Sequence, residues 1–269
     1  MLDLEPQRRA KFPGGTVLVY PRADAELVAS DWIASAIGAA IDDRGQAVVG
    51  LATGSTPIPV YEHLVSLRTS GKLPFDFKSV ITYNLDEYYP MSPTDPNSYR
   101  AFMDKHLFRR VGLAANRTHV LDGTVPEAYT QHHASDFDRW IAADGGLDLQ
   151  LLGLGRNGHI GFNEPSDLTV EVALALPTRL VELHPTTRSD AIKDFGTEFD
   201  VPRRALTMGI ASILAARSIL VLAFGSNKAD AVAESLMGTM TARMPGSLLQ
   251  SVARKVTWLV DAESAAKLF

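Results

Sequence analysis

The sequence contains no cysteine, which excludes disulfide bonds, thiolate catalysis and metal sites built from cysteine. It has no apolar run of the roughly eighteen residues that a membrane-spanning helix needs, and no N-terminal signal pattern. It also lacks a basic stripe, and its net charge is −5. These absences argue against a membrane or a nucleic acid as the main partner, and we expect a cytoplasmic protein.

What the chain does contain is ample material for a core, with 46% apolar and 21% charged residues over 269 positions. Apolar runs such as 47–52 and 218–224 have the continuous character of central parallel strands, and amphipathic helical segments alternate with them. We find no Pro/Gly linker and no internal repeat. The pattern predicts an α/β fold with one doubly wound, mostly parallel sheet, helices on both faces, and a single domain over residues 1–269. Residues 1–15 are expected to be an irregular lead-in.

The stretch 147–165 begins as an apolar strand and continues as a loop with four glycines in close succession. This loop carries Asn157, His159, Asn163 and Glu164. An open α/β sheet places its ligand at the carboxyl ends of its strands, so these polar groups are candidates for an active site. The alternative is a tight turn that holds one satisfied histidine.

Within this stretch, Gly153 to Gly158 fits the dinucleotide-binding pattern G-x-G-x-x-G. That fingerprint also requires a helix to begin at once, so that its N-terminus meets the pyrophosphate. Gly161 and Pro165 oppose a long helix here. We therefore expect no nicotinamide cofactor.

A second loop of small residues, Thr53 to Pro57, leads from a buried strand into a helix. Thr56 is a suitable N-cap and Pro57 a favoured first helical residue. Free N–H groups at a helix N-terminus suit a phosphate, which makes Gly54, Ser55 and Thr56 candidate ligands. An ordinary capped turn is the alternative, and the loop is not a Walker motif.

Two further polar positions follow predicted strands. Asp86 lies two residues after the end of the strand 79–84, although it could instead cap a local turn. Lys228 lies where the helix 229–237 begins, where it could meet a phosphate or simply be solvated. His132 and His133 are adjacent on a helix, roughly 100° apart, so they cannot share a metal facially and are expected to be solvated.

Together these motifs resemble the glucosamine-6-phosphate deaminase family, within a wider group that includes sugar-phosphate isomerases and 6-phosphogluconolactonases. The segment from Gly158 to Pro165, Gly-His-Ile-Gly-Phe-Asn-Glu-Pro, is specific for deaminases. Lactonases share only its Gly-His and carry arginine where this chain has Tyr88. The resemblance extends from Leu51 to Lys228 and comprises Gly54–Pro57, Asn84–Tyr88, Leu152–Pro165, Ala205–Ile210 and Gly225–Lys228.

The resemblance implies ring opening of glucosamine 6-phosphate, isomerisation through an enolamine, and release of ammonia to give fructose 6-phosphate, without a metal or an organic cofactor. It implies that Asp86 moves the C2 proton and that His159 transfers the ring-opening proton, supported by Glu164 and Asn157. Such chemistry needs a carboxylate near the C2 proton and a group that titrates near neutrality. The implied phosphate ligands are Gly54, Ser55, Thr56, Lys193 and Lys228.

This chain also departs from the family pattern. Asn157 stands where some members have aspartate, and Lys193 stands where the family has a phosphate-binding arginine that could bind bidentately. A short insertion falls between Pro165 and Arg179. The basic pair that binds an allosteric effector in some members is half present, as Arg179 and Val181.

Other functions stay open at this point. A galactosamine-6-phosphate deaminase/isomerase would share the same base and loop. A lactonase-type hydrolase is disfavoured by Tyr88 and Glu164. A non-catalytic sugar-phosphate sensor would need a DNA-binding module, for which we see no room before Thr16. The expected partner is a small hexosamine 6-phosphate, and the chain could form a homo-oligomer.

Overall fold

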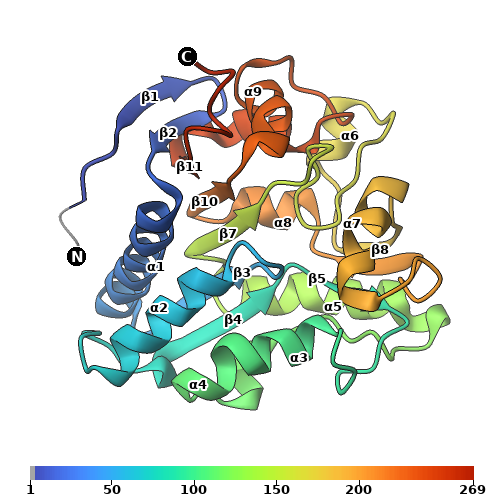
Figure 1. Cartoon of the computed structure of the whole chain (residues 1–269). Coiled ribbons are helices and arrows are strands. Elements are labelled where there is room, and N and C mark those ends of the chain that lie inside the picture. The colour runs from blue at the N-terminus through green and yellow to red at the C-terminus, as the bar shows by residue number, and fades with distance from the viewer. Residues whose placement is uncertain (1–3) are drawn as a thin grey trace.

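The computed structural model describes residues 4–269, and its centre is an eight-stranded sheet in the order β1-β2-β11-β10-β7-β3-β4-β6 (Figure 1). All neighbouring strands are parallel except β1 and β2. The mostly parallel sheet predicted from the sequence is therefore confirmed. Its strands are β1 (Arg8–Phe12), β2 (Gly15–Val19), β3 (Ala47–Leu51), β4 (Val80–Asn84), β6 (Thr118–His119), β7 (Leu149–Gly153), β10 (Ser218–Ala223) and β11 (Val256–Val260).

Helices pack around this sheet, as predicted (Figure 1). The longest, α1, ends at Arg44 and is capped by Gly45, whose φ of 78° lies in the left-handed region that glycine favours. A π-helical turn, Asp104–Phe108, joins α3 to α4. The helices are α1 (Arg22–Arg44), α2 (Ile58–Thr69), α3 (Tyr99–Met103), α4 (Arg109–Val111), α5 (Thr130–Ala143), α6 (Val170–Leu174), α7 (Pro185–Phe195), α8 (Ile210–Ala215) and α9 (Ala229–Met237).

The central strands are largely buried. All five residues of β3 and of β4 are buried, which explains why they read as continuous apolar or β-branched runs instead of alternating ones. Trp258 on β11 is fully buried, and its indole Nε1 donates a hydrogen bond to the Gly14 carbonyl at 3.0 Å. The N–H group of this large buried side chain therefore has a hydrogen-bond partner within the core.

A second sheet of three antiparallel strands, in the order β5-β9-β8, was not predicted. Its strands are β5 (Asp86–Tyr89), β8 (Arg179–Glu182) and β9 (Arg204–Thr207). Only Leu85 separates β4 from β5, and its N–H bonds to the Leu51 carbonyl at 3.0 Å. Asp86 therefore does not end a central strand. It opens a strand of the second sheet, immediately beyond the central one.

The prediction of an irregular lead-in over residues 1–15 was wrong for part of that range. Arg8–Phe12 forms β1, which pairs antiparallel with β2 at the sheet edge. Its sequence, Arg-Arg-Ala-Lys-Phe, suits an exposed edge strand, since charged side chains there discourage further pairing. Residues 1–3 lie outside the described part of the chain.

Two smaller predictions also need correction. Thr56 does not cap α2, because the cap position is Pro57 and no side chain makes the capping hydrogen bond. His133 is not simply solvated, because its Nε2 accepts a hydrogen bond from the Asp122 N–H at 2.9 Å. His132 is exposed, as expected.

The strand order creates a crevice between β3 and β7. From β3 the chain continues to its neighbour β4, whereas the other neighbour of β7 is β10, on the opposite side. Loops that leave adjacent strands in opposite directions open a gap at the carboxyl edge of a sheet. The loops after β3 and β7 are the small-residue loop and the glycine-rich loop singled out in the sequence.

Candidate active site

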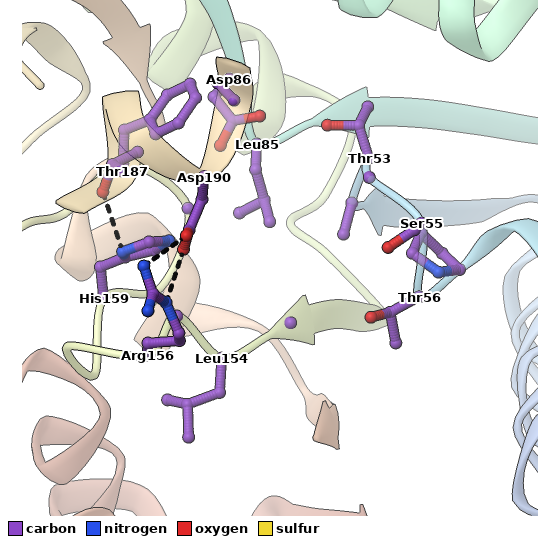
Figure 2. Close-up of a pocket in the computed structure, with 18 of the residues that line it drawn as sticks. Thr53, Ser55, Thr56, Leu85, Asp86, Leu154, Arg156, His159, Thr187 and Asp190 are labelled. Carbon is purple, nitrogen blue, oxygen red and sulfur yellow. Dashed lines mark hydrogen bonds and ion pairs between the residues drawn. The ribbon is translucent and has the colours of Figure 1, made fainter. Parts of the chain in front are cut away.

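A cavity of about 540 Å³ lies at this crevice (Figure 2). The loops after β3, β7 and β10 line it, together with the start of β5 and one side of α7. It brings together seven of the predicted site residues, namely Gly54, Ser55, Thr56, Asp86, His159, Lys193 and Lys228. The remaining two, Asn157 and Glu164, contact His159 without lining the cavity.

Asn157, Glu164 and Thr187 hold one ring nitrogen of His159. The Nδ1 atom lies 2.7 Å from the Asn157 Oδ1, 3.4 Å from the Glu164 Oε2 and 3.3 Å from the Thr187 Oγ1. The Asn157 Nδ2 also donates to the Glu164 Oε2 at 3.0 Å, so the amide orients both the ring and the carboxylate. With Nδ1 held in this way, Nε2 is the nitrogen left to face a ligand.

Burial by itself would raise the pKa of Glu164, but hydrogen bonding and charge attraction from His159 outweigh it and the pKa is lowered. Glu164 therefore carries a negative charge at neutral pH. Its side chain is only 10% exposed, and that of His159 is 18% exposed. A fixed anion in a shielded position stabilises a positive charge that forms on the imidazole during proton transfer.

The glycines of the loop after β7 make room for this arrangement. A Cβ on Gly155 would lie 2.3 Å from the His159 ring, so only glycine lets the ring fold back against the loop. Gly161, at φ 57°, lies beside Asp86, since a Cβ there would be 3.5 Å from the Asp86 Oδ2. The motif thus brings the histidine loop next to the carboxylate of the second sheet.

Asp86 is buried, at 6% exposure, yet it lines the cavity. Among residues 4–269 it forms no ion pair. Burial first, and the nearby charge of Glu87 second, hold the pKa of Asp86 well above its usual range. A carboxylate with a raised proton affinity in a shielded cavity has the properties of a general base.

The neighbouring acid, Glu87, has a structural task instead. Its carboxylate accepts hydrogen bonds from the N–H groups of Tyr88, Tyr99 and Arg100 at 2.9 to 3.0 Å. These bonds tie β5 to the N-terminus of α3. Burial raises the pKa of Glu87 to about 7, although the three hydrogen bonds act in the opposite direction.

One part of the cavity, its cationic end, is positively charged. Arg156, Lys193 and Lys228 line this cationic end, and the Gly54–Thr56 turn, where Gly54 has a φ of 96° that glycine favours, lines the same cavity. Burial lowers the pKa of Lys228, partly offset by the charge of Asp190. Three clustered cations, in a cavity that is also lined by a turn leading into a helix, suit an anionic ligand.

Several residues of the cavity were not predicted. Thr187 and Asp190 lie on α7, which covers the cavity, and Tyr99 lies on α3. Arg22 contributes from the start of α1. No sequence signal identified them, because they come from elements without a motif. Arg156 could have been identified, since it stands inside the glycine-rich loop.

Arg179 lies apart from the cavity. Its Nη1 donates to the Asn163 Oδ1 at 2.9 Å and to the Pro177 carbonyl at 3.2 Å, and burial lowers its pKa. The guanidinium is therefore engaged inside the protein. Val181, on the same strand, is half-buried against the cluster formed by Tyr88 and Phe162.

Across residues 4–269, we find no group of three or more histidine, aspartate or glutamate side chains arranged to hold a metal ion. Within the same residues, no helix combines the length and apolarity needed to cross a bilayer.

This fold and site define a class of sugar-phosphate isomerases and related hydrolases. Residues 22–258 match the family model of glucosamine-6-phosphate isomerases/6-phosphogluconolactonase, and the chain belongs to this family. Within the family it is similar to proteins named glucosamine-6-phosphate deaminase. One, from Halothermothrix orenii, is 42% identical over 84% of this chain and 89% of its own length. Another, from Rhodopirellula baltica, is 44% identical over 89% of this chain and 91% of its own.

Solved structures of similar proteins have the same fold. A monomeric glucosamine-6-phosphate deaminase superposes with a TM-score of 0.84 at 34% identity, covering 93% of this chain and 98% of its own. A 6-phosphogluconolactonase from Thermotoga maritima gives a TM-score of 0.66 at 20% identity, over 91% and 97% of the two chains. The second likeness concerns the fold alone.

Proposed function

We propose that this protein is a glucosamine-6-phosphate deaminase, which converts glucosamine 6-phosphate and water into fructose 6-phosphate and ammonia. The observation that carries the proposal is the placement of the buried Asp86 carboxylate and of His159, braced by Glu164, on one cavity that has a cationic end. The relatives named as deaminases align with 84% and 89% of this chain. The net reaction breaks the C2–N bond with water.

Each step of the proposed reaction has a side chain suited to it. His159 transfers the proton that opens the sugar ring, and Glu164 stabilises the charge that the imidazole gains. Asp86 then takes the C2 proton to give the enolamine and returns it to C1, and water hydrolyses the resulting C2 imine to the ketose and ammonia. Asn157 keeps the imidazole in its orientation. No step asks for a metal or an organic cofactor.

A lactonase function has less support. The 6-phosphogluconolactonase structure resembles this chain in its fold alone. Hydrolysis of a lactone has no step in which a base takes a proton from C2. A sensor has no use for a carboxylate, an imidazole and a second carboxylate held together. The choice between glucosamine 6-phosphate and galactosamine 6-phosphate as substrate is decided by an assay of ammonia release. A single domain, a cytoplasmic location and homo-oligomer formation stay predictions, and one related deaminase is monomeric.

The test is release of ammonia from a panel of hexosamine 6-phosphates. We expect turnover of glucosamine 6-phosphate with formation of fructose 6-phosphate. Preferred turnover of galactosamine 6-phosphate would favour the alternative deaminase/isomerase. Hydrolysis of 6-phosphogluconolactone without any ammonia release would overturn the proposal.

Replacing Lys228 with Ala is expected to raise KM for the phosphorylated substrate by roughly tenfold or more, because a half-shielded charge contact with phosphate is lost. The kcat value should change much less. Steady-state kinetics with glucosamine 6-phosphate and with glucosamine measure the effect. Arg243→Ala, which removes an exposed arginine paired with Asp167 outside the cavity, is the matched control. Equal turnover of glucosamine and its phosphate by the unaltered enzyme would contradict the assignment of this end of the cavity.

We expect hyperbolic kinetics and no activation by N-acetylglucosamine 6-phosphate. Arg179 already bonds to Asn163 and Pro177, and Val181 supplies no charge, so a second phosphate would find at most one cation. A tenfold coupling between two sites needs about 1.4 kcal/mol of differential affinity, more than an exposed contact supplies. Initial rates with and without the compound test this. A sigmoidal curve that the compound makes hyperbolic would show the prediction to be wrong.

A further inference from the structure

An ion pair crosses the cationic end of the cavity. The guanidinium of Arg156, on the loop after β7, faces the carboxylate of Asp190 on α7 (Figure 2). Its Nε lies 3.0 Å from Oδ2, and Nη2 contacts Oδ1, so the pair is bidentate. The side chains are 41% and 44% exposed, which leaves the pair open to exchange with an anion from solvent.

Asp190 also acts on a second cation of the cavity, Lys228. Its charge raises the pKa of Lys228, whereas Arg156 and Lys193 lower it. One carboxylate therefore sits among three cations at the place where the proposed function puts the substrate phosphate. A phosphate dianion and this carboxylate would compete for the same partners, since like charges brought together in a shielded site repel.

The helix that carries Asp190 also reaches the catalytic end. Thr187 and Asp190 are three residues apart on α7 and thus share a face. The Thr187 Oγ1 lies 3.3 Å from the His159 Nδ1, while Asp190 holds Arg156. The Arg156–Asp190 pair therefore joins the cationic end to the helix that contacts the imidazole.

We propose that Asp190 is a specificity-determining residue, and this proposal rests on the proposed function. Its carboxylate is an internal anion that holds Arg156 until the phosphate of the substrate replaces it. A hexosamine 6-phosphate has sugar hydroxyl and amino groups whose contacts help to displace the carboxylate. Free inorganic phosphate has no such contacts and must compete with Asp190 by charge alone. The pair thus makes the site discriminate against small anions.

The experiment measures direct binding of inorganic phosphate to the full chain by calorimetry. Asp190→Asn removes the competing charge and should tighten phosphate binding on the order of fivefold to tenfold, with a lower KM for the hexosamine 6-phosphate. Asp190→Glu keeps the charge and should leave the phosphate Kd within about threefold of the unaltered protein. Asp194→Asn is the matched control, because Asp194 also lines the cavity on α7 but forms no ion pair within residues 4–269. It should shift the Kd by less than about twofold.

Two outcomes would overturn the inference. An Asp190→Asn protein that binds phosphate no more tightly than the unaltered protein would show that the carboxylate does not compete. Equal weakening by Asp190→Asn and Asp190→Glu would show that the pair only holds α7 in place. The proposed function fails separately, if the unaltered protein binds phosphate but releases no ammonia from any hexosamine 6-phosphate.

Discussion

Replacing Asp86 with Asn is expected to lower kcat for deamination on the order of 10²–10⁴-fold, because the amide cannot accept the C2 proton. The side chain is nearly isosteric and the position is buried, so the fold should persist. The informative measurement is exchange of the C2 hydrogen with solvent deuterium, followed by NMR. Exchange at close to the normal rate in this variant would remove Asp86 from the role of base.

The pH dependence of the unaltered enzyme gives a control for this role. Burial and Glu87 raise the pKa of Asp86, so its carboxylate form is lost at a higher pH than for an ordinary aspartate as the solution is acidified. We therefore expect the acid limb of kcat/KM to lie well above the usual aspartate range. The Asp86→Asn protein should bind inorganic phosphate as tightly as the unaltered protein, because the side chain of Asp86 contributes no positive charge to the phosphate site.

Replacing His159 with Gln is expected to slow turnover of the cyclic substrate by on the order of 10²–10⁴-fold, through loss of the proton transfer that opens the ring. Gln can keep a polar contact with Asn157 and Glu164 but cannot carry a proton from the anomeric hydroxyl to the ring oxygen. Steady-state ammonia release measures the loss.

An acyclic analogue separates this defect from a loss of binding. The open-chain amino alcohol of glucosamine 6-phosphate needs no ring opening, so the His159→Gln protein should bind it with a Kd close to that of the unaltered protein. Thr187→Ser, which keeps a hydroxyl near the same ring nitrogen, is the matched control and should retain most activity. Normal ammonia release by His159→Gln would remove His159 from the proposed mechanism.

The sequence predicted the central sheet well because parallel strands with both faces buried leave long apolar runs. β3, β7 and β10 were all recognised in this way. The charged edge strand β1 was missed, because exposed edge residues need not be apolar. The second sheet was missed because β5, β8 and β9 are short and come from distant parts of the chain.

The sequence by itself determined the chemistry of the loops. Glycine spacing and polar side chains predicted that Asn157, His159 and Glu164 share one loop, and Asp86 and Lys228 line the same cavity as His159. These residues follow strands, and parallel strands bring their carboxyl ends to one edge of the sheet. Only the tertiary structure decided which elements pack over that edge of the sheet. α7 brings Thr187 to His159 and Asp190 to Arg156, and β5 turns Asp86 into a second sheet beside Gly161. Such contacts depend on the packing of elements far apart in the chain, which no local pattern of residues records.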